Sequence, residues 1–162
     1  MTPQRLENIA VYYLARYEAS TARLRAVLAA RVRRSPNRAE VPEAWLDAVV
    51  AKMAASGYVD DARFAEGLVR RGVEAGRSAR WIGGKLRAAG LRPEDYLGEE
   101  VSEGESARAL DYARRKRLAA RDSAEFRKFL GRMGRAGFSY DDSKAALATL
   151  SGEDMEDSDA EG

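Results

Sequence analysis

The chain contains no cysteine and no histidine. Without cysteine it can form no disulfide bond, which is typical of reducing compartments, and we expect a cytoplasmic protein. Without histidine, zinc sites built from His and Cys, His-dependent catalytic triads and imidazole acid–base catalysis are excluded. The commonest routes to a small hydrolase are therefore closed, and we expect a protein that is not an enzyme.

Long apolar runs are also missing. No stretch approaches the roughly 20 apolar residues that cross a bilayer, and the first ten residues lack the apolar core of a signal peptide. We therefore expect no association with membranes. Proline is scarce, with four in 162 residues, and Ala, Leu, Arg and Glu are abundant, which favours helix.

Apolar residues recur with the 3.6-residue period of an amphipathic helix. The first stripe consists of Leu6, Ile9, Ala10, Tyr13, Leu14 and Tyr17. No segment alternates convincingly with period two, so a sheet is not expected. The sequence predicts an all-α fold.

A pattern of about 50 residues recurs three times along the chain. Predicted N-caps at Ser20, Ser78 and Asp122 are each followed at +4 and +8 by an apolar pair. Asp122, with Glu125 three residues later, also resembles a capping box. The apolar pairs are Leu24 and Leu28, Ile82 and Leu86, and Phe126 and Leu130.

Each copy also contains a helix that ends in glycine and an apolar residue. These endings are Gly57–Tyr58, Gly90–Leu91 and Gly137–Phe138, and the first falls one helix later in its copy than the other two. At Gly57 we expect a left-handed C-cap, with Tyr58 folded back onto the helix.

The pattern predicts three tandem three-helix repeats stacked into an elongated body. The first repeat spans residues 1–59, the second 60–104 with a short helix opened by Pro93, and the third 105–150. Residues 151–162 contain six acids and no base, and we expect a disordered acidic tail there.

No catalytic or metal-binding pattern stands out. Gly84–Lys85 fails as a phosphate loop, because Ala79 and Leu86 stand where glycine and Ser or Thr are needed. The acid pairs at 60–61, 99–100 and 141–142 are explained by helix starts or a short exposed helix, so no metal and no cofactor are expected. Core packing is the main interpretation, and base stacking the alternative, for Trp45, Phe64, Trp81, Phe126 and Phe129.

Charge is strongly segregated along the chain. Cations dominate residues 1–38, 63–92 and 108–135, and acids dominate the segments between and after them. The four successive cations at 114–117 point in several directions around a helix and cannot all pair with local acids. The alternatives are a solvated face, or a surface that contacts an acidic protein or DNA phosphate. The candidate partner-binding residues are Arg70, Arg71, Arg77, Arg80, Lys85, Arg87, Arg114, Arg115 and Arg117.

The segment 57–65, Gly-Tyr-Val-Asp-Asp-Ala-Arg-Phe-Ala, resembles the RecX family, regulators of the RecA recombinase. The resemblance continues at 77–80 with Ile82 and Leu86, and at 137–141, and it covers about residues 5–150. The loop at 33–40 is longer than the usual connection, and the acidic tail is an addition. The motif residues expected to be mainly structural are Gly57, Tyr58, Asp60, Asp61, Arg63 and Phe64.

The resemblance implies three tandem three-helix units in an elongated, curved body. It implies a monomer that binds RecA and the RecA–ssDNA filament and inhibits strand exchange, ATP hydrolysis and co-protease activity. Such a protein restrains recombination and the SOS response. The alternative is a sequence-independent DNA-binding helical module, and weak non-specific DNA binding is compatible with both.

Overall fold

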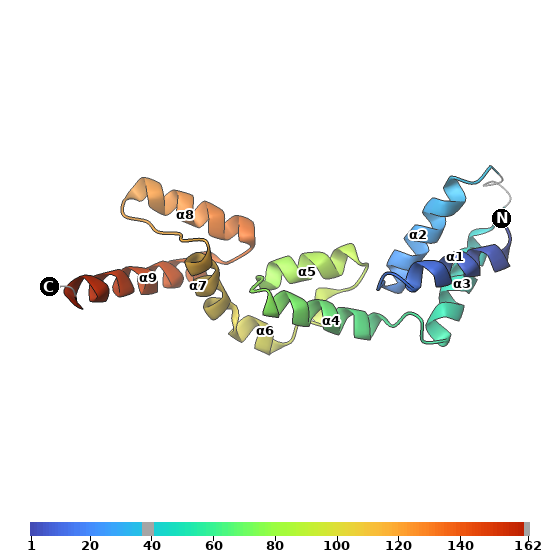
Figure 1. Ribbon diagram of the computed structural model, residues 1–162, viewed down its shortest axis with the longest axis horizontal. Coiled ribbons are helices and arrows are strands. Elements are labelled where there is room, and N and C mark those ends of the chain that lie inside the picture. Colours follow the sequence, from blue (N-terminus) through green and yellow to red (C-terminus); the bar gives the residue numbers. More distant parts are fainter. Residues whose placement is uncertain (37–40, 161–162) are drawn as a thin grey trace. The chain divides into compact units, whose positions relative to one another are not determined.

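The structure is a computed structural model that describes residues 1–36 and 41–160, with side chains described through residue 152. In this part of the chain every regular element is a helix, and no strand is present (Figure 1). The all-helical fold is therefore confirmed, whereas the grouping into three repeats stays a prediction. The end of the 33–40 loop and the last two residues of the predicted tail lie outside the described residues.

The helices follow one another through short connections. Their bounds are α1 Pro3–Leu14, α2 Thr21–Arg33, α3 Glu43–Ala55, α4 Asp61–Glu74, α5 Ala79–Ala88, the 3-10 helix η2 Pro93–Asp95, α6 Glu99–Glu103, α7 Glu105–Arg115, α8 Ser123–Ala136 and α9 Tyr140–Ala160.

The capping box predicted at the start of α8 is present. Asp122 Oδ1 accepts hydrogen bonds from the backbone N–H groups of Ala124 and Glu125, both at 2.8 Å. The Glu125 carboxylate in turn accepts from the backbone N–H of Arg121 at 2.7 Å. This return bond falls one residue before the cap, where the usual box places it on the cap itself.

Left-handed glycines end α3, α5 and α8, as the sequence predicted. They are Gly57, Gly90 and Gly137, with φ of +72°, +76° and +93°. The predicted contact of Tyr58 with its helix is wrong, because that side chain is 56% exposed. The N–H groups of Tyr58 and Val59 both bond to the Met53 carbonyl, and this reversal leaves Val59 facing the core with 3% of its surface exposed.

The described chain divides into two compact units. The first comprises Met1–Gly67 and Leu86–Arg92, and the second comprises Leu68–Lys85 and Pro93–Gly162. These bounds cut across the three predicted repeats, whose boundaries remain predictions.

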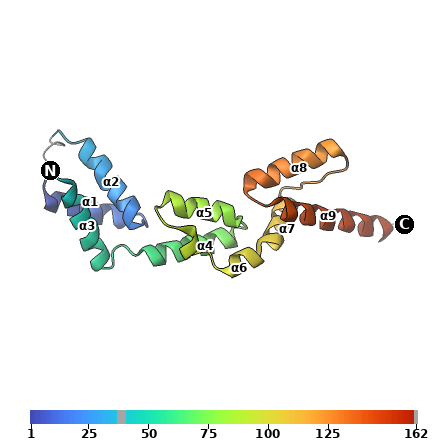
Figure 2. The same ribbon diagram turned by 180° about the vertical axis from the view of Figure 1, so that it is seen from behind.

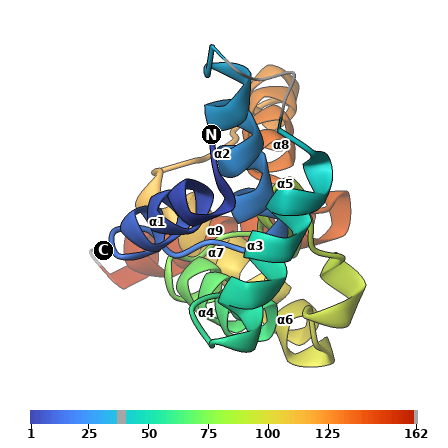
Figure 3. The same cartoon turned by 90° about the vertical axis from the view of Figure 1, so that its right-hand side faces the viewer.

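In the first unit α1, α2 and α3 surround one apolar core (Figure 3). Its buried residues are Leu6, Ala10, Leu24, Leu28, Val32, Leu46, Val49, Met53 and Val59. The predicted stripe of the first helix therefore faces the core, except at Tyr17. That residue lies beyond the end of α1 and is 58% exposed.

In the second unit α7, α8 and α9 surround another core (Figure 2). Its buried residues are Ala109, Ala113, Leu118, Phe129, Met133, Phe138 and Ala146. The same unit holds the end of α4 against α5. A Cβ at Gly72 would lie 2.6 Å from Ile82 Cγ1, so the glycine is what permits this close approach.

The short helix expected after Pro93 forms as two pieces, η2 and α6. Gly98 lies between them in an extended conformation, with φ −72° and ψ 169°. This break places Val101 of α6 in the interior, with 3% of its surface exposed. The split leaves α6 a single turn that leads directly into α7.

The start of α2 makes a distinctive set of contacts. The buried Ser20 hydroxyl accepts from the N–H of Arg23 at 3.1 Å and donates to the carbonyl oxygen of Ala89 at 2.5 Å. The next N–H, that of Thr21, donates to Asp61 at 2.7 Å. A cap at one helix start thus also binds the end of α5 and the first residue of α4.

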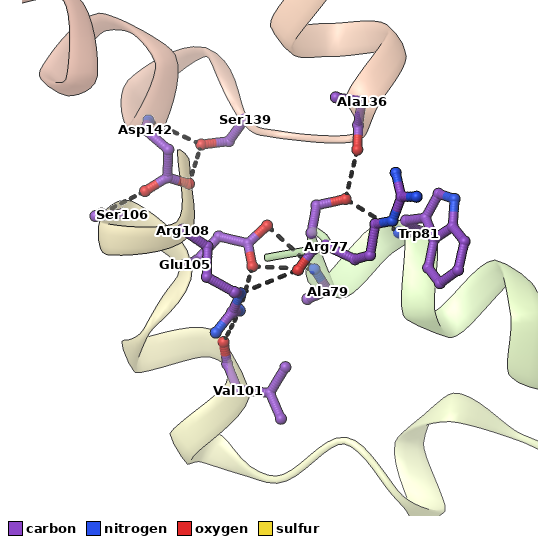
Figure 4. A network of polar contacts seen from close by, with 11 residues as sticks. Arg77, Ala79, Trp81, Val101, Glu105, Ser106, Arg108, Ala136, Ser139 and Asp142 are labelled. Atoms are coloured by element: carbon purple, nitrogen blue, oxygen red, sulfur yellow. Dashed lines mark hydrogen bonds and ion pairs between the residues drawn. The ribbon is translucent and has the colours of Figure 1, made fainter. Parts of the chain in front are cut away.

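The start of α5 repeats this arrangement (Figure 4). The buried Ser78 hydroxyl accepts from the N–H of Trp81 at 3.2 Å and donates to the carbonyl oxygen of Ala136 at 2.7 Å. The next N–H, that of Ala79, donates to Glu105 at 3.0 Å. In both sets the accepting carbonyl precedes a left-handed glycine. Tandem units of equal architecture would produce this recurrence.

The last helix differs from the expectation. The sequence predicted a disordered tail from Ser151, whereas α9 continues past Leu150 to Ala160. Extending an existing helix adds one backbone hydrogen bond for each residue fixed, without a new nucleation step. The segment has no proline to stop it.

Candidate functional site

A hollow of about 400 Å³ opens in the second unit between α5, α7 and α8. Four cations stand around it, contributed by Arg77, Lys116, Arg132 and Arg135. Aromatic and apolar side chains complete the lining, and no acid takes part. The hollow therefore combines positive charge with ring surface.

The α5 helix contributes the aromatic side chain of Trp81 to the lining of this hollow. The Arg77 guanidinium carbon lies 4.8 Å from the indole centroid, and Lys85 Nζ lies 5.2 Å from it. Both distances are within the range of cation–π attraction. Core packing was the main sequence interpretation for Trp81, but the side chain is only partly buried and lines a surface. Phe129, by contrast, is 2% exposed and confirms the core interpretation.

The start of α5 is held in place by a buried ion pair (Figure 4). Arg108, 8% exposed, lies 2.6 Å from the Glu105 carboxylate that receives the N–H of Ala79. The same guanidinium donates to the carbonyl oxygens of Arg77, at 3.0 Å, and Val101. Because the donors and acceptors of the pair are satisfied, it can be buried and can fix the loop that leads to Trp81.

Tyr112 forms the α7 side of the hollow. Its ring packs against the buried Phe138 ring with the centroids 5.5 Å apart and the planes tilted by 50°. Leu118 lies in the chain segment that follows α7 and belongs to the same lining as Lys116. Its side chain is 8% exposed. The aromatic wall is therefore anchored in the core of the second unit.

A second hollow, of about 550 Å³, runs along α8. Its lining residues recur at helical spacing and are Ala124, Arg127, Lys128, Gly131, Arg132 and Arg135. This stripe is basic, whereas the buried residues of the same helix, Phe129 and Met133, are apolar. Because Gly131 has no side chain, the surface of α8 is recessed at the middle of this stripe.

The two hollows share Arg132 and Arg135, so they form one continuous surface. We call it the basic surface and define it by Arg77, Trp81, Lys85, Lys116, Arg127, Lys128, Arg132 and Arg135. Among the described residues, no ion pair joins these cations to a carboxylate. Their charges are therefore available to an external anion.

The nine cations that the sequence proposed as partner-binding residues differ in their contacts in the structure. Arg77 and Lys85 meet at Trp81, and Arg80 stands nearby on α5, where its Cβ faces Gly137. Arg114 pairs with Asp111 at 3.8 Å. Arg115 donates to the carbonyl oxygen of Ala75 at 3.5 Å.

The remaining predicted cations line neither of these two hollows. Arg70 and Arg71 are exposed on α4, and Arg71 has an interaction of its own. Arg117 is exposed with a left-handed φ of +50°, and Arg87 belongs to the first compact unit. The sequence indicated Lys116 only as part of the run 114–117, and it did not predict Arg127, Lys128, Arg132 and Arg135 as site residues, although the α8 spacing places these four on one face.

The motif at 57–64 makes contacts within the protein. Asp60 caps α4 through the N–H of Arg63 at 3.0 Å, and the Arg63 guanidinium donates to the carbonyl oxygen of Gly57 at 3.4 Å. Asp61 accepts from both the N–H and the hydroxyl of Thr21, at 2.7 and 2.8 Å. Phe64 is partly buried. These contacts give the motif a structural role at the turn between α3 and α4.

The described part of the chain lacks two kinds of site. It holds no group of three or more acidic, His or Cys side chains placed to bind a metal ion. None of its helices combines the length and the apolar character that a bilayer crossing requires.

Comparison with known proteins gives a consistent result. No protein-family model matches the chain. A regulatory protein RecX from Myxococcus xanthus (strain DK1622) is 34% identical over an alignment of 164 positions, gaps included, that covers 91% of this chain and 86% of the relative. The crystal structure of RecX from Lactobacillus salivarius matches with a TM-score of 0.68 at 17% identity, covering 92% and 96% of the two chains. A second crystal structure, of regulatory protein RecX, has a TM-score of 0.66 at 17% identity, covering 88% and 70%. At such identity the two structures show the fold alone.

Proposed function

The chain belongs to the RecX family of regulatory proteins, and from this premise we propose that it binds RecA and the filament that RecA forms on single-stranded DNA. In this role it inhibits the recombinase, ATPase and co-protease activities of RecA, and so restrains recombination and the SOS response. It acts as a cytoplasmic monomer by binding alone, without a cofactor and without chemistry of its own.

The observation that supports this proposal most directly is the basic surface. Its cations stand on α5 and α8 and beside α7, without carboxylate partners among the described residues. A RecA–DNA filament offers two kinds of anion, the phosphates of the DNA and acidic side chains of the protein. Arginine binds both, because its planar guanidinium matches the geometry of carboxylate and phosphate oxygens.

The proposed contact residues are therefore the basic surface together with the other sequence-predicted cations. The first set of these cations lies on α5 or just before it, within or beside the basic surface, and consists of Arg77, Arg80 and Lys85. Arg70, Arg71, Arg87 and Arg117 form a second set that can contact another part of an extended partner. Arg114 and Arg115 already have intramolecular contacts, so we expect them to contribute least.

A second candidate function is sequence-independent binding of single-stranded DNA. Trp81 between two cations favours it, because an aromatic ring beside positive charge is a typical platform for an unpaired base. The two functions differ in their ligand. A filament regulator binds RecA-coated DNA more tightly than bare DNA, and a simple DNA-binding module does not.

Binding measurements on the two ligands test the proposal. Fluorescein-labelled oligothymidine is used bare or coated with RecA and a non-hydrolysable ATP analogue, and fluorescence anisotropy reports binding. We expect tighter binding to the coated strand, and at least about tenfold weaker binding for Arg132→Glu with Arg135→Glu.

The matched control is Arg121→Glu with Lys144→Glu, which makes the same charge change outside the basic surface. It should bind as the parent does. Equal affinity for coated and bare strands would support the DNA-binding function and contradict the proposed one.

A further inference from the structure

A groove in the first unit has no part in the function proposed above. It lies between α1 and α2 and encloses about 590 Å³, within the range of ligand-binding clefts. Its floor is apolar and consists of Ile9, Ala26, Val27 and Ala30. Small residues on one helix leave room there for an inserted side chain.

Arginines stand around this apolar floor. Arg23, Arg31, Arg33 and Arg34 of α2 and its C-terminus line the groove, and no acid lines it. In the described part of the chain none of these four side chains forms an ion pair. The rim is therefore positive over its whole α2 side.

Another arginine of α2 shows that this arrangement is not forced by the helix. Arg25 turns toward α3 and bonds to Asp47 at 2.7 Å and to Glu43 at 3.0 Å. These hydrogen bonds, that of Asp47 first, raise the pKa of Arg25. The protein thus neutralises the arginine on one side of α2 and leaves those on the groove side unpaired.

The groove is longer than its main hollow. An adjoining hollow of about 340 Å³ shares Ile9, Arg31 and Arg34 with it and adds Arg5 from α1. The two together make a channel with an apolar centre and arginines along its length. This shape suits an extended chain better than a small compact molecule.

Tyrosines form the α1 side of the groove, and each ring has one neighbour within the chain. The Arg16 guanidinium carbon lies 3.9 Å from the Tyr12 ring centroid, and the Tyr13 and Tyr17 rings lie 5.1 Å apart. A nucleic-acid base stacks on an open ring face. Tyr12 and Tyr17 remain 65% and 58% exposed, so the apolar floor, rather than these rings, is what favours an inserted side chain over a stacked base.

We propose that the α1–α2 groove binds an acidic peptide segment of a partner protein through a central apolar side chain. The apolar residue inserts on the floor between Ile9 and Val27. Carboxylates on either side pair with Arg31, Arg34 and their neighbours. The complementarity of charge selects the peptide, and the inserted side chain fixes its register.

The test uses the full chain and defined probes, without RecA. A short fluorescein-labelled peptide of aspartate and glutamate with a central Leu-Phe pair is titrated by anisotropy. A second peptide has Ser-Ser in place of Leu-Phe, and labelled oligothymidine is the third probe. We expect the first peptide to bind at least about fivefold tighter than the second, because burial of the apolar side chains on the floor of the groove favours binding.

Two variants locate the site by independent means. Arg31→Glu with Arg34→Glu should weaken binding of the Leu-Phe peptide at least about tenfold. Ala30→Leu should weaken it without any change of charge, because leucine fills the floor and remains a good helix former. Arg121→Glu with Lys144→Glu, outside both the groove and the basic surface, should bind the peptide as the parent does, and circular dichroism should show unchanged helicity in all variants.

The proposal is overturned by any of three results. One is equal binding of the two peptides, and another is full binding by the Ala30→Leu protein. The third is tighter binding of oligothymidine that is lost in the Arg31 and Arg34 variant, which would make the groove a nucleic-acid site. None of these results bears on whether the protein regulates RecA.

Discussion

The Ser78 hydroxyl donates a 2.7 Å hydrogen bond to the carbonyl oxygen of Ala136, which lies 58 residues further along the chain. The Ser78 hydroxyl oxygen also accepts from the N–H of Trp81, so one buried hydroxyl both caps the start of α5 and binds the end of α8. Glu105 and Arg108 fix the loop beside it. The basic surface depends on this arrangement, because it sets α5 against α8.

Replacing Ser78 with alanine should lower the free energy of unfolding by about 1–3 kcal/mol, because it removes a cap and leaves the Ala136 carbonyl without its donor. Urea unfolding followed by circular dichroism measures the change. Ser102→Ala, on the exposed surface of α6, is the control and should stay within about 0.5 kcal/mol of the parent. Equal stability of the two variants would contradict the structural role of Ser78.

Two glycines of the α8 region should respond in opposite directions to alanine. Gly137 has φ +93°, and a Cβ there would overlap the Ser78 Oγ atom, so we expect a loss of about 2–4 kcal/mol. Gly134 lies inside α8 with nothing within 4 Å of a Cβ, so alanine should add about 0.5–1 kcal/mol. The midpoints of thermal unfolding should move accordingly, and a shift of both in one direction would mean that α8 ends elsewhere.

The buried Arg108 should matter far more to stability than an exposed arginine of the same helix. Arg108→Met leaves the Glu105 carboxylate and two carbonyls without this donor, at a cost of about 3–5 kcal/mol. Arg114→Met removes a 3.8 Å exposed pair and should cost about 0–1 kcal/mol. Urea titrations of both variants provide the comparison, and similar costs would refute the role assigned to the buried pair.

Removing residues 151–162 should hardly change the unfolding temperature, because Leu150 is the last residue in the described part of the chain that packs against the core of the second unit. The segment contains six acids, which compete with phosphates for nearby cations through their high effective concentration. The truncated protein should therefore bind bare oligothymidine more tightly, and more clearly at low salt. Unchanged affinity at both salt concentrations would show that the acids do not reach the DNA-binding cations.

Local structure was predictable because its causes are local. The caps at Ser20, Ser78 and Asp122 and the left-handed glycines follow from residue type and spacing, and the structure has them. The partners of the two serine hydroxyls were not predictable, because Ala89 and Ala136 lie 69 and 58 residues away. Residue type defines a donor but not the distant carbonyl that packing brings to it.

The basic surface was predictable only in part for a related reason. The charge pattern identified Arg77 and Lys85 as candidates. It did not predict that both contact the Trp81 ring, because the helical spacing of Trp81 also fits a core position. The run at 114–117 indicated binding, yet Lys116 alone lines the surface while Arg114 and Arg115 contact their own chain. The stripe through Arg127 and Arg132 follows helical spacing, so the sequence contained its signal.

If the chain regulates RecA through the basic surface, ATP hydrolysis by RecA on single-stranded DNA should respond to changes at that surface. The rate is measured with increasing amounts of the parent protein, of Arg132→Glu with Arg135→Glu, and of the control Arg121→Glu with Lys144→Glu. We expect the parent and the control to suppress hydrolysis, and the basic-surface variant to need at least about tenfold more protein for the same effect. Hydrolysis that continues unchanged at saturating parent protein would show that the chain does not regulate RecA.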